Sequence, residues 1–147
     1  MPEIKEELIK MLNHALELEH AARIQYLAHA ELIKGEDAEP IIERIKEIAG
    51  DEGKHEEIFR NLIGNFLGGE PAMTLAETHR ATERKKIFEV NLKGEKDAID
   101  FYKQLYQKVT DNKKDLPYEF ETLEHDIRHV ILDEQEHVSE LSLLLGL

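Results

Sequence analysis

The sequence predicts an all-α protein, a four-helix up-and-down bundle. Apolar residues recur three and four positions apart in four long stretches, and no stretch alternates apolar and polar residues as a half-buried strand would. Short segments join the first stretch to the second and the third to the fourth, whereas a longer one joins the second to the third. Because helices joined by short loops pack antiparallel, we expect two antiparallel hairpins linked by a crossover.

Glycine and proline mark the expected helix ends. Gly35 follows the first apolar stretch and suits a helix stop, while Pro40 and Pro117 suit the first turn of the second and fourth helices. Thr74 is a candidate start for a helical turn within the crossover. We expect helices at about 3–34, 40–67, 83–109 and from 117 onward, with the crossover at 68–82 and a turn at 110–116.

Length and composition favour a cytoplasmic globular protein. The 147 residues suffice for one hydrophobic core, so we expect a single domain over residues 1–147. No apolar run approaches bilayer length, and the first residues are charged where a secretory signal would be apolar, so we expect no membrane partner. The chain has no cysteine, so any metal must be bound through oxygen or nitrogen.

The chain is strongly acidic, with 32 Asp and Glu residues and a formal net charge of −13. Nucleic-acid binding requires a basic face to contact phosphates, so this composition argues against a nucleic-acid partner. It favours cations, although surplus acid that merely keeps a helical protein soluble is the alternative. The choice between the two depends on whether particular carboxylates converge.

Two motifs occur once in each expected hairpin. An E-x-x-A-x-x-x-Y motif starts at Glu19 in the first helix and at Glu95 in the third. A D-E-x-x-H motif starts at Asp51 in the second helix and at Asp133 in the fourth. The two hairpins therefore repeat each other, which indicates an internal two-fold relation between them.

Each D-E-x-x-H motif places a glutamate and a histidine on one helix face. Residues three apart lie together, so Glu52 with His55, and Glu134 with His137, can present an oxygen and a nitrogen to one point. Both pairs are in register with the apolar residues of their helices. A single E-x-x-H is common and usually belongs to a solvated face, but two copies in register favour a metal site.

Glu19 and Glu95 also lie among apolar residues, so four carboxylates should point into the core. Burying one unpaired carboxylate costs several kcal/mol, so four would exceed a domain's whole stability of about 5–15 kcal/mol. No Lys or Arg is spaced to neutralise them, whereas two divalent cations carry equal and opposite charge and leave the histidines as neutral ligands. The sequence therefore predicts two buried divalent metal ions.

A ligating imidazole needs a partner for its other ring nitrogen, and Asp51 and Asp133 are the candidates. Each precedes a motif glutamate by one residue, about 100° around the helix. We therefore expect Asp51 to reach His137 and Asp133 to reach His55, with a solvent-facing aspartate as the alternative. The remaining histidines fall off the inward stripe or in the crossover and are expected at the surface: His14, His20, His29, His79, His125 and His129.

The sequence resembles the ferritin-like di-iron carboxylate family. The stretch Leu12-Asn13-His-Ala-Leu16-x-x-Glu19-x-x-Ala22-x-x-Gln25-Tyr26 is similar to the first helix of bacterioferritins, and Glu52-x-x-His55-x-x-Ile-Phe-x-x-Leu62 to bacterioferritin and rubrerythrin second helices. The resemblance covers nearly the whole chain and implies a ferritin-like fold with two iron ions. It implies terminal ligands at Glu19 and Glu95, bridging ligands at Glu52 and Glu134, and one nitrogen each from His55 and His137.

Tyr26 and Tyr102 lie seven residues after Glu19 and Glu95 and are candidate hydroxyl donors to the bridging carboxylates. Tyrosines that only fill the core are the alternative. Where similar bacterioferritins carry a haem-ligating methionine, this chain has Gly53, so we do not expect haem there. This sequence lacks the short extra helix of cage ferritins, so we do not expect a storage shell, and it also lacks the cysteine-rich rubredoxin module of full-length rubrerythrins.

These features predict a di-iron oxidoreductase of the ferroxidase or peroxidase type, with the six ligands and two tyrosines as its catalytic centre. The expected substrates are Fe(II) and dioxygen or hydrogen peroxide, with an unidentified electron donor, in a homo-oligomer that is at least a dimer. The alternatives are a bacterioferritin-type iron storage or delivery protein and a bundle in which zinc is purely structural. Manganese also fits a set of glutamates and histidines.

Overall fold

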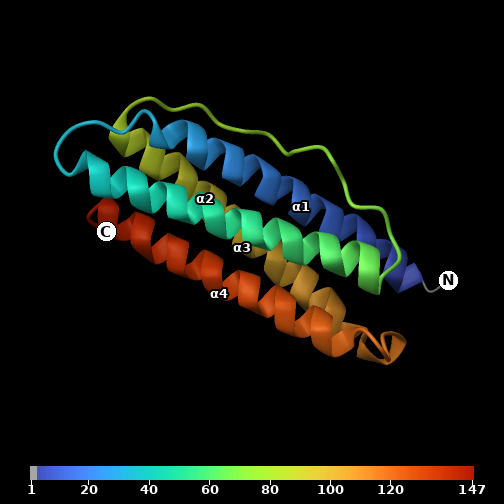
Figure 1. Ribbon diagram of the computed structural model, residues 1–147. Helices are drawn as coiled ribbons and strands as arrows, with labels where there is room; N and C mark the ends of the chain where they lie inside the picture. The colour runs from blue at the N-terminus through green and yellow to red at the C-terminus, as the bar shows by residue number, and fades with distance from the viewer. Residues whose placement is uncertain (1–2) are drawn as a thin grey trace.

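The computed structural model describes residues 3–147 as a bundle of four long helices. Figure 1 shows two antiparallel hairpins, α1 with α2 and α3 with α4, packed side by side. This arrangement confirms the all-α fold predicted from the apolar period. The helices are α1 (Glu3–Ala30), α2 (Ala38–Asn61), α3 (Arg84–Asp111) and α4 (Phe120–Leu144), with a π-helical turn at Leu62–Phe66 and a 3₁₀ turn at Lys113–Asp115.

The crossover between the hairpins, residues 67–83, runs along the outside of α1 from one end of the bundle to the other (Figure 1). It contains no helix, so the helical turn expected at Thr74 is wrong. The Thr74 hydroxyl donates to the Glu17 carboxylate, its carbonyl oxygen lies 2.7 Å from Nδ1 of His20, and the Ala76 N–H donates to the Glu17 carbonyl at 3.0 Å. These contacts with α1 satisfy the polar groups of an extended segment, which removes the need for a helical turn.

Two helix ends differ from the sequence expectation. The first helix ends at Ala30 rather than near residue 34, because the chain turns there and brings Ile33 into the core at 3% exposure. Gly35 has a φ of +100°, which a residue with a side chain rarely adopts. The fourth helix begins at Phe120 rather than Pro117, since Leu116 is fully buried and its carbonyl accepts the Phe120 N–H at 3.1 Å.

The apolar core consists of two clusters separated by a polar layer. The larger cluster includes Leu12 and Phe59 and extends toward the α3–α4 turn, whereas the smaller includes Ile45 and Leu141 near the opposite end. Along each helix the buried glutamate of the repeated motif lies between residues of the two clusters. The polar layer is therefore enclosed by apolar side chains at both ends. None of the helices in residues 3–147 has the length and apolar character needed to cross a membrane.

Replacing Leu123 with Ala should lower the free energy of unfolding by about 2–5 kcal/mol, because this fully buried side chain would leave a cavity in the larger cluster. Leu132→Ala is the matched control on the same helix. Its side chain is 48% exposed, and the expected loss is about 0.5 kcal/mol or less. Urea unfolding followed by circular dichroism measures both. Equal losses for the two variants would contradict the packing described here.

Candidate metal centre

All six predicted ligand residues meet in the polar layer. The inward faces of α1 and α3 supply one glutamate each, and the D-E-x-x-H motifs of α2 and α4 each supply a glutamate and a histidine. Every one of these side chains is at most 3% exposed. The residues that the structure brings together are Glu19, Glu52, His55, Glu95, Glu134 and His137.

Their donor atoms form two groups, each able to hold one metal ion. Glu19 and His55 belong to the first group only, and Glu95 and His137 to the second only. Both groups contain the two glutamates of the D-E-x-x-H motifs, and within each group the donor atoms lie within 4.8 Å of one another. The arrangement is that of a dinuclear site with two shared carboxylates.

Nδ1 of His55 faces the oxygens of the first group. The separations are 3.5 Å to Glu19 Oε2, 3.3 Å to Glu52 Oε1 and 3.4 Å to Glu134 Oε1. Donors bound to one cation at about 2.1 Å lie roughly 3.0–3.4 Å from each other. The spacing around His55 therefore suits one divalent ion at the centre of the group.

Nδ1 of His137 has equivalent surroundings in the second group. It lies 3.4 Å from Glu95 Oε2, 3.2 Å from Glu134 Oε1 and 3.6 Å from Glu52 Oε1. The two imidazole rings lie 6.4 Å apart, measured between centroids. The second group therefore repeats the first, as the sequence repeat between the hairpins implies.

The donor atoms that face this space have no hydrogen-bond partner within residues 3–147, although buried polar groups in proteins are nearly always paired. Leaving so many unpaired in one place would be very costly unless cations bind them. The donor set therefore fits two divalent ions. The unpaired atoms are Glu19 Oε2, both oxygens of Glu52, His55 Nδ1, Glu95 Oε2, Glu134 Oε1 and His137 Nδ1.

Burial makes ionisation of the carboxylates difficult. It raises the pKa of Glu19 to about 7 and that of Glu95 to about 8, and the neighbouring charge of Glu134 adds to both shifts. Burial lowers the pKa of His137, but the facing oxygens of Glu134 and Glu95 outweigh it and raise the pKa to about 11. Without metal, protons must therefore supply the positive charge that the cluster lacks.

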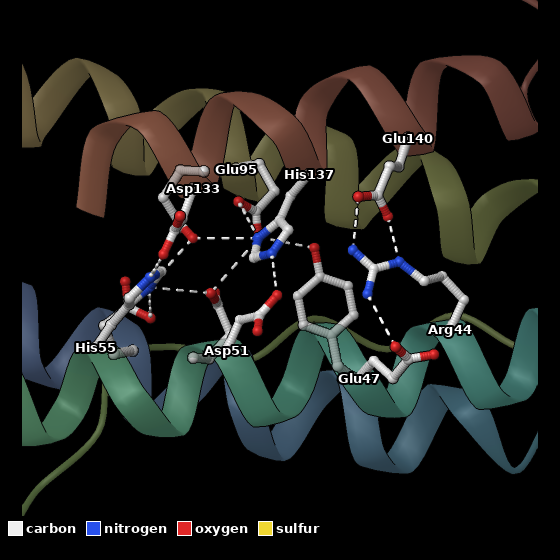
Figure 2. Close-up of polar contacts among 12 residues, drawn as sticks. Arg44, Glu47, Asp51, His55, Glu95, Asp133, His137 and Glu140 are labelled. Atoms are coloured by element: carbon white, nitrogen blue, oxygen red, sulfur yellow. Dashed lines mark hydrogen bonds and ion pairs between the residues drawn. The ribbon is translucent and has the colours of Figure 1, made fainter. Parts of the chain in front are cut away.

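The second ring nitrogen of each histidine contacts an aspartate of the facing helix, as predicted. His55 Nε2 lies 2.9 Å from Asp133 Oδ2, and His137 Nε2 lies 2.9 Å from Asp51 Oδ2. Figure 2 shows these two contacts crossing between α2 and α4. Because a carboxylate only accepts, each Nε2 carries a hydrogen, which leaves Nδ1 as the nitrogen that can bind a metal ion once the ion displaces the Nδ1 proton.

The tyrosines contact carboxylates, but not those expected. The Tyr26 hydroxyl donates to Glu95 Oε1 at 2.8 Å, and the Tyr102 hydroxyl donates to Glu19 Oε1 at 2.6 Å. The expectation that they contact Glu52 and Glu134 is therefore wrong. Because α1 and α3 are antiparallel, a tyrosine two turns after the glutamate of one helix lies opposite the glutamate of the other (Figure 1).

A cavity of about 230 Å³ adjoins the cluster between α1 and α3. Its inner lining includes all four glutamates and both tyrosines. Its outer lining includes four exposed polar residues, two of them from the crossover: His14, Glu77, His79 and Asp97. Glu77 and His79 belong to no sequence motif, and nothing in the crossover sequence indicates that these two residues lie over α1.

The expectation that His29 is a surface residue is wrong. Its side chain is 4% exposed, and its Nδ1 accepts from Asn91 Nδ2 at 2.9 Å. Gln25 donates to Asn91 at 2.9 Å and accepts the His79 N–H at 2.6 Å. Burial lowers the pKa of His29. These hydrogen bonds join α1, α3 and the crossover beside the cavity. In the sequence, the network is indicated only by the spacing of Gln25 and His29, which lie one helical turn apart on α1.

Comparisons with known proteins agree with this geometry. The sequence profile of the ferritin-like domain matches residues 9–147. A solved ferritin-like diiron-carboxylate protein from Bacillus anthracis has a TM-score of 0.90, with 24% identity and coverage of 99% of both chains. The bacterioferritin of Desulfovibrio desulfuricans has a TM-score of 0.87 and 23% identity, covering 98% of this chain and 81% of that one.

A dodecameric thioferritin from Bacteroides fragilis has a TM-score of 0.84 and 24% identity, over 97% of this chain and 86% of that one. No curated protein sequence matches the chain. At these identities the structural matches establish the fold, whereas the profile match spans nearly the whole sequence and establishes the family. With a four-helix bundle around a buried glutamate and histidine cluster, this chain belongs to the ferritin-like domain family.

Proposed function

We propose that this protein is an iron oxidoreductase that oxidises Fe(II) with dioxygen or hydrogen peroxide, as a ferroxidase or a peroxidase. The observation that carries the proposal is that the two donor groups share Glu52 and Glu134. Two ions held through shared carboxylates could act together on one small oxidant, whereas a purely structural ion needs neither shared ligands nor a partner ion. The proposal includes a homo-oligomer that is at least a dimer and an electron donor whose identity is unknown.

Each residue has a distinct proposed role. Glu52 and Glu134 would be shared by the two ions, Glu19 and Glu95 would each hold one ion, and the histidines would bind through Nδ1. The assignment of Glu52 and Glu134 as shared ligands is supported by the membership of both residues in both donor groups. When bound, two iron ions supply the one-electron redox steps, which glutamate and histidine side chains cannot provide by themselves.

The remaining groups hold the ligands in place and exclude water. Asp51 and Asp133 fix the protonated nitrogen of each histidine, which orients the ring and raises its basicity. Tyr26 and Tyr102 each bind one oxygen of a terminal glutamate and leave the other directed at the cluster. The two apolar clusters keep bulk water from both ends of the site, which strengthens its electrostatics.

The cavity between α1 and α3 is the proposed route by which Fe(II) and the oxidant reach the cluster. Its outer lining carries the carboxylates of Glu77 and Asp97, which attract cations. Its volume of about 230 Å³ accommodates dioxygen, peroxide or a hydrated ion but is small for a large organic substrate. This size favours an inorganic substrate.

Iron storage or delivery is the second candidate function. The structural neighbours include bacterioferritins and a thioferritin that is a dodecamer, so at least one chain of similar fold forms a large assembly. Native mass and iron capacity distinguish the two functions. A dimer that holds two irons per chain argues against storage, and a large assembly that takes up many irons per chain argues against a simple catalyst. Manganese or structural zinc is tested by the metal content of the isolated protein and by its redox response.

Anaerobic loading with Fe(II), followed by separate exposure to dioxygen and to hydrogen peroxide, tests the redox proposal. We expect two Fe(II) per chain to bind in the buried centre, and ferric absorbance to develop with at least one oxidant and faster than in protein-free buffer. Faster oxidation by dioxygen would indicate a ferroxidase, and faster oxidation by hydrogen peroxide would indicate a peroxidase. No change in absorbance with either oxidant would refute the redox proposal while leaving metal binding open.

Replacing Glu52 with Ala should abolish paired metal binding, because this carboxylate belongs to both donor groups. Glu57→Ala is the matched control, since it removes an exposed carboxylate from the same helix. Metal content after equilibrium dialysis measures both variants, and circular dichroism checks that each is folded. A folded Glu52→Ala protein that still binds two ions in the buried centre would overturn the bridging assignment.

Replacing Asp133 with Ala should weaken metal binding by roughly 10- to 100-fold, as expected when the partner of a ligating histidine is removed. The control is Asp100→Ala, which removes an exposed aspartate of α3. Competition with a chelator of known affinity measures the change. Unaltered affinity in Asp133→Ala would mean that the aspartate does not support His55 as a ligand.

A further inference from the structure

A second pair of imidazoles lies on the surface of α4, separate from the buried centre. His125 and His129 are one helical turn apart, and both are exposed. Their ring centroids are 4.2 Å apart with an angle of 34° between the ring planes. The two rings therefore lie side by side on the exposed face of the helix, close enough for one ion to reach a nitrogen of each after small side-chain rotations.

A carboxylate orients the first of these rings. Nδ1 of His125 lies 3.0 Å from Asp126 Oδ1, and 58% of the His125 side chain is exposed. Since the carboxylate accepts, Nδ1 carries the hydrogen and Nε2 keeps a lone pair. The aspartate contacts of His55 and His137 in the buried centre have the same effect, with the two ring nitrogens exchanged.

Histidine pairs with this spacing on one helix face can bind a single metal ion, because both nitrogens reach one point above the helix. Imidazole favours divalent transition metals, including zinc, copper, nickel and iron, over magnesium and calcium. The net charge of −13 attracts cations to the surface as a whole. Exposure leaves room for water to complete the coordination.

We propose that His125 and His129 bind one divalent transition-metal ion at the surface of α4, as a third site besides the buried pair. Asp126 orients the first ligand by holding its Nδ1–H. The site is open and involves only a surface pair of one helix, so it needs neither the buried ligands nor metal in the centre. His129 also precedes Asp133 by one turn, which places the surface ion on the helix that supports His55.

Equilibrium dialysis against Zn²⁺, which is redox-silent, tests the proposal on the full chain. We expect the unaltered protein to bind three ions, and His125→Ala or His129→Ala to bind two. Gln135→Ala, an exposed neutral residue of the same helix, should retain three. Asp126→Ala should weaken the third ion by about tenfold, because it loses the orienting carboxylate.

Glu52→Ala separates this proposal from the proposed function. It should lose the buried pair and keep one ion, which Zn²⁺ titration detects as a shift of the imidazole NMR signals of His125 and His129. The surface site is refuted if those signals do not move, or if both histidine variants bind as many ions as the unaltered protein. Loss of one ion in the histidine variants, with the buried pair unaffected by Glu52→Ala, would instead refute the buried ligand assignment alone.

Discussion

Four glutamates meet in a space from which water is largely excluded, and this concentration of negative charge is the constraint on which the rest of the site depends. Each of the four helices contributes one of these glutamates, so the negative charge accumulates only when the two hairpins pack together. Burial raises the pKa of Glu19 and Glu95, and the facing carboxylates raise the pKa of His55 and His137. The cluster must therefore hold either protons or metal ions, and its unpaired donor atoms have the spacing that metal ions require.

The repeat between the hairpins makes each half support the other. The aspartate of one D-E-x-x-H motif binds the histidine of the other, and the tyrosine that follows one motif glutamate binds the other glutamate. Both pairings follow because α2 is antiparallel to α4 and α1 is antiparallel to α3. In an antiparallel pair, a residue that follows the motif glutamate of one helix lies opposite a residue at or before the motif glutamate of the other. The support for each ligand thus exists only when the hairpins are assembled, which couples the geometry of the site to the packing of the bundle.

Fold and chemistry contribute separately to the functional proposal. A four-helix bundle of this kind hosts several functions, so the fold by itself does not select one. The selection depends on the shared carboxylates, the fixed imidazoles and a small cavity with acidic residues at its outer end. These features suit a centre where two ions and a small inorganic molecule meet. The apolar clusters on either side supply the stability that allows such a costly polar layer in the core.

The sequence by itself determined the four helices, the convergence of the six ligand side chains, and the contact of each motif aspartate with the histidine of the other motif. Helical periodicity was sufficient for these because it indicates which residues share a face. The sequence did not determine where α1 ends, which carboxylates the tyrosines contact, that His29 is buried, or that Glu77 and His79 line the cavity. Those features depend on the register of α1 against α3 and on the path of the crossover. Periodicity within one helix carries no information about the partner it meets, so only tertiary packing decided them.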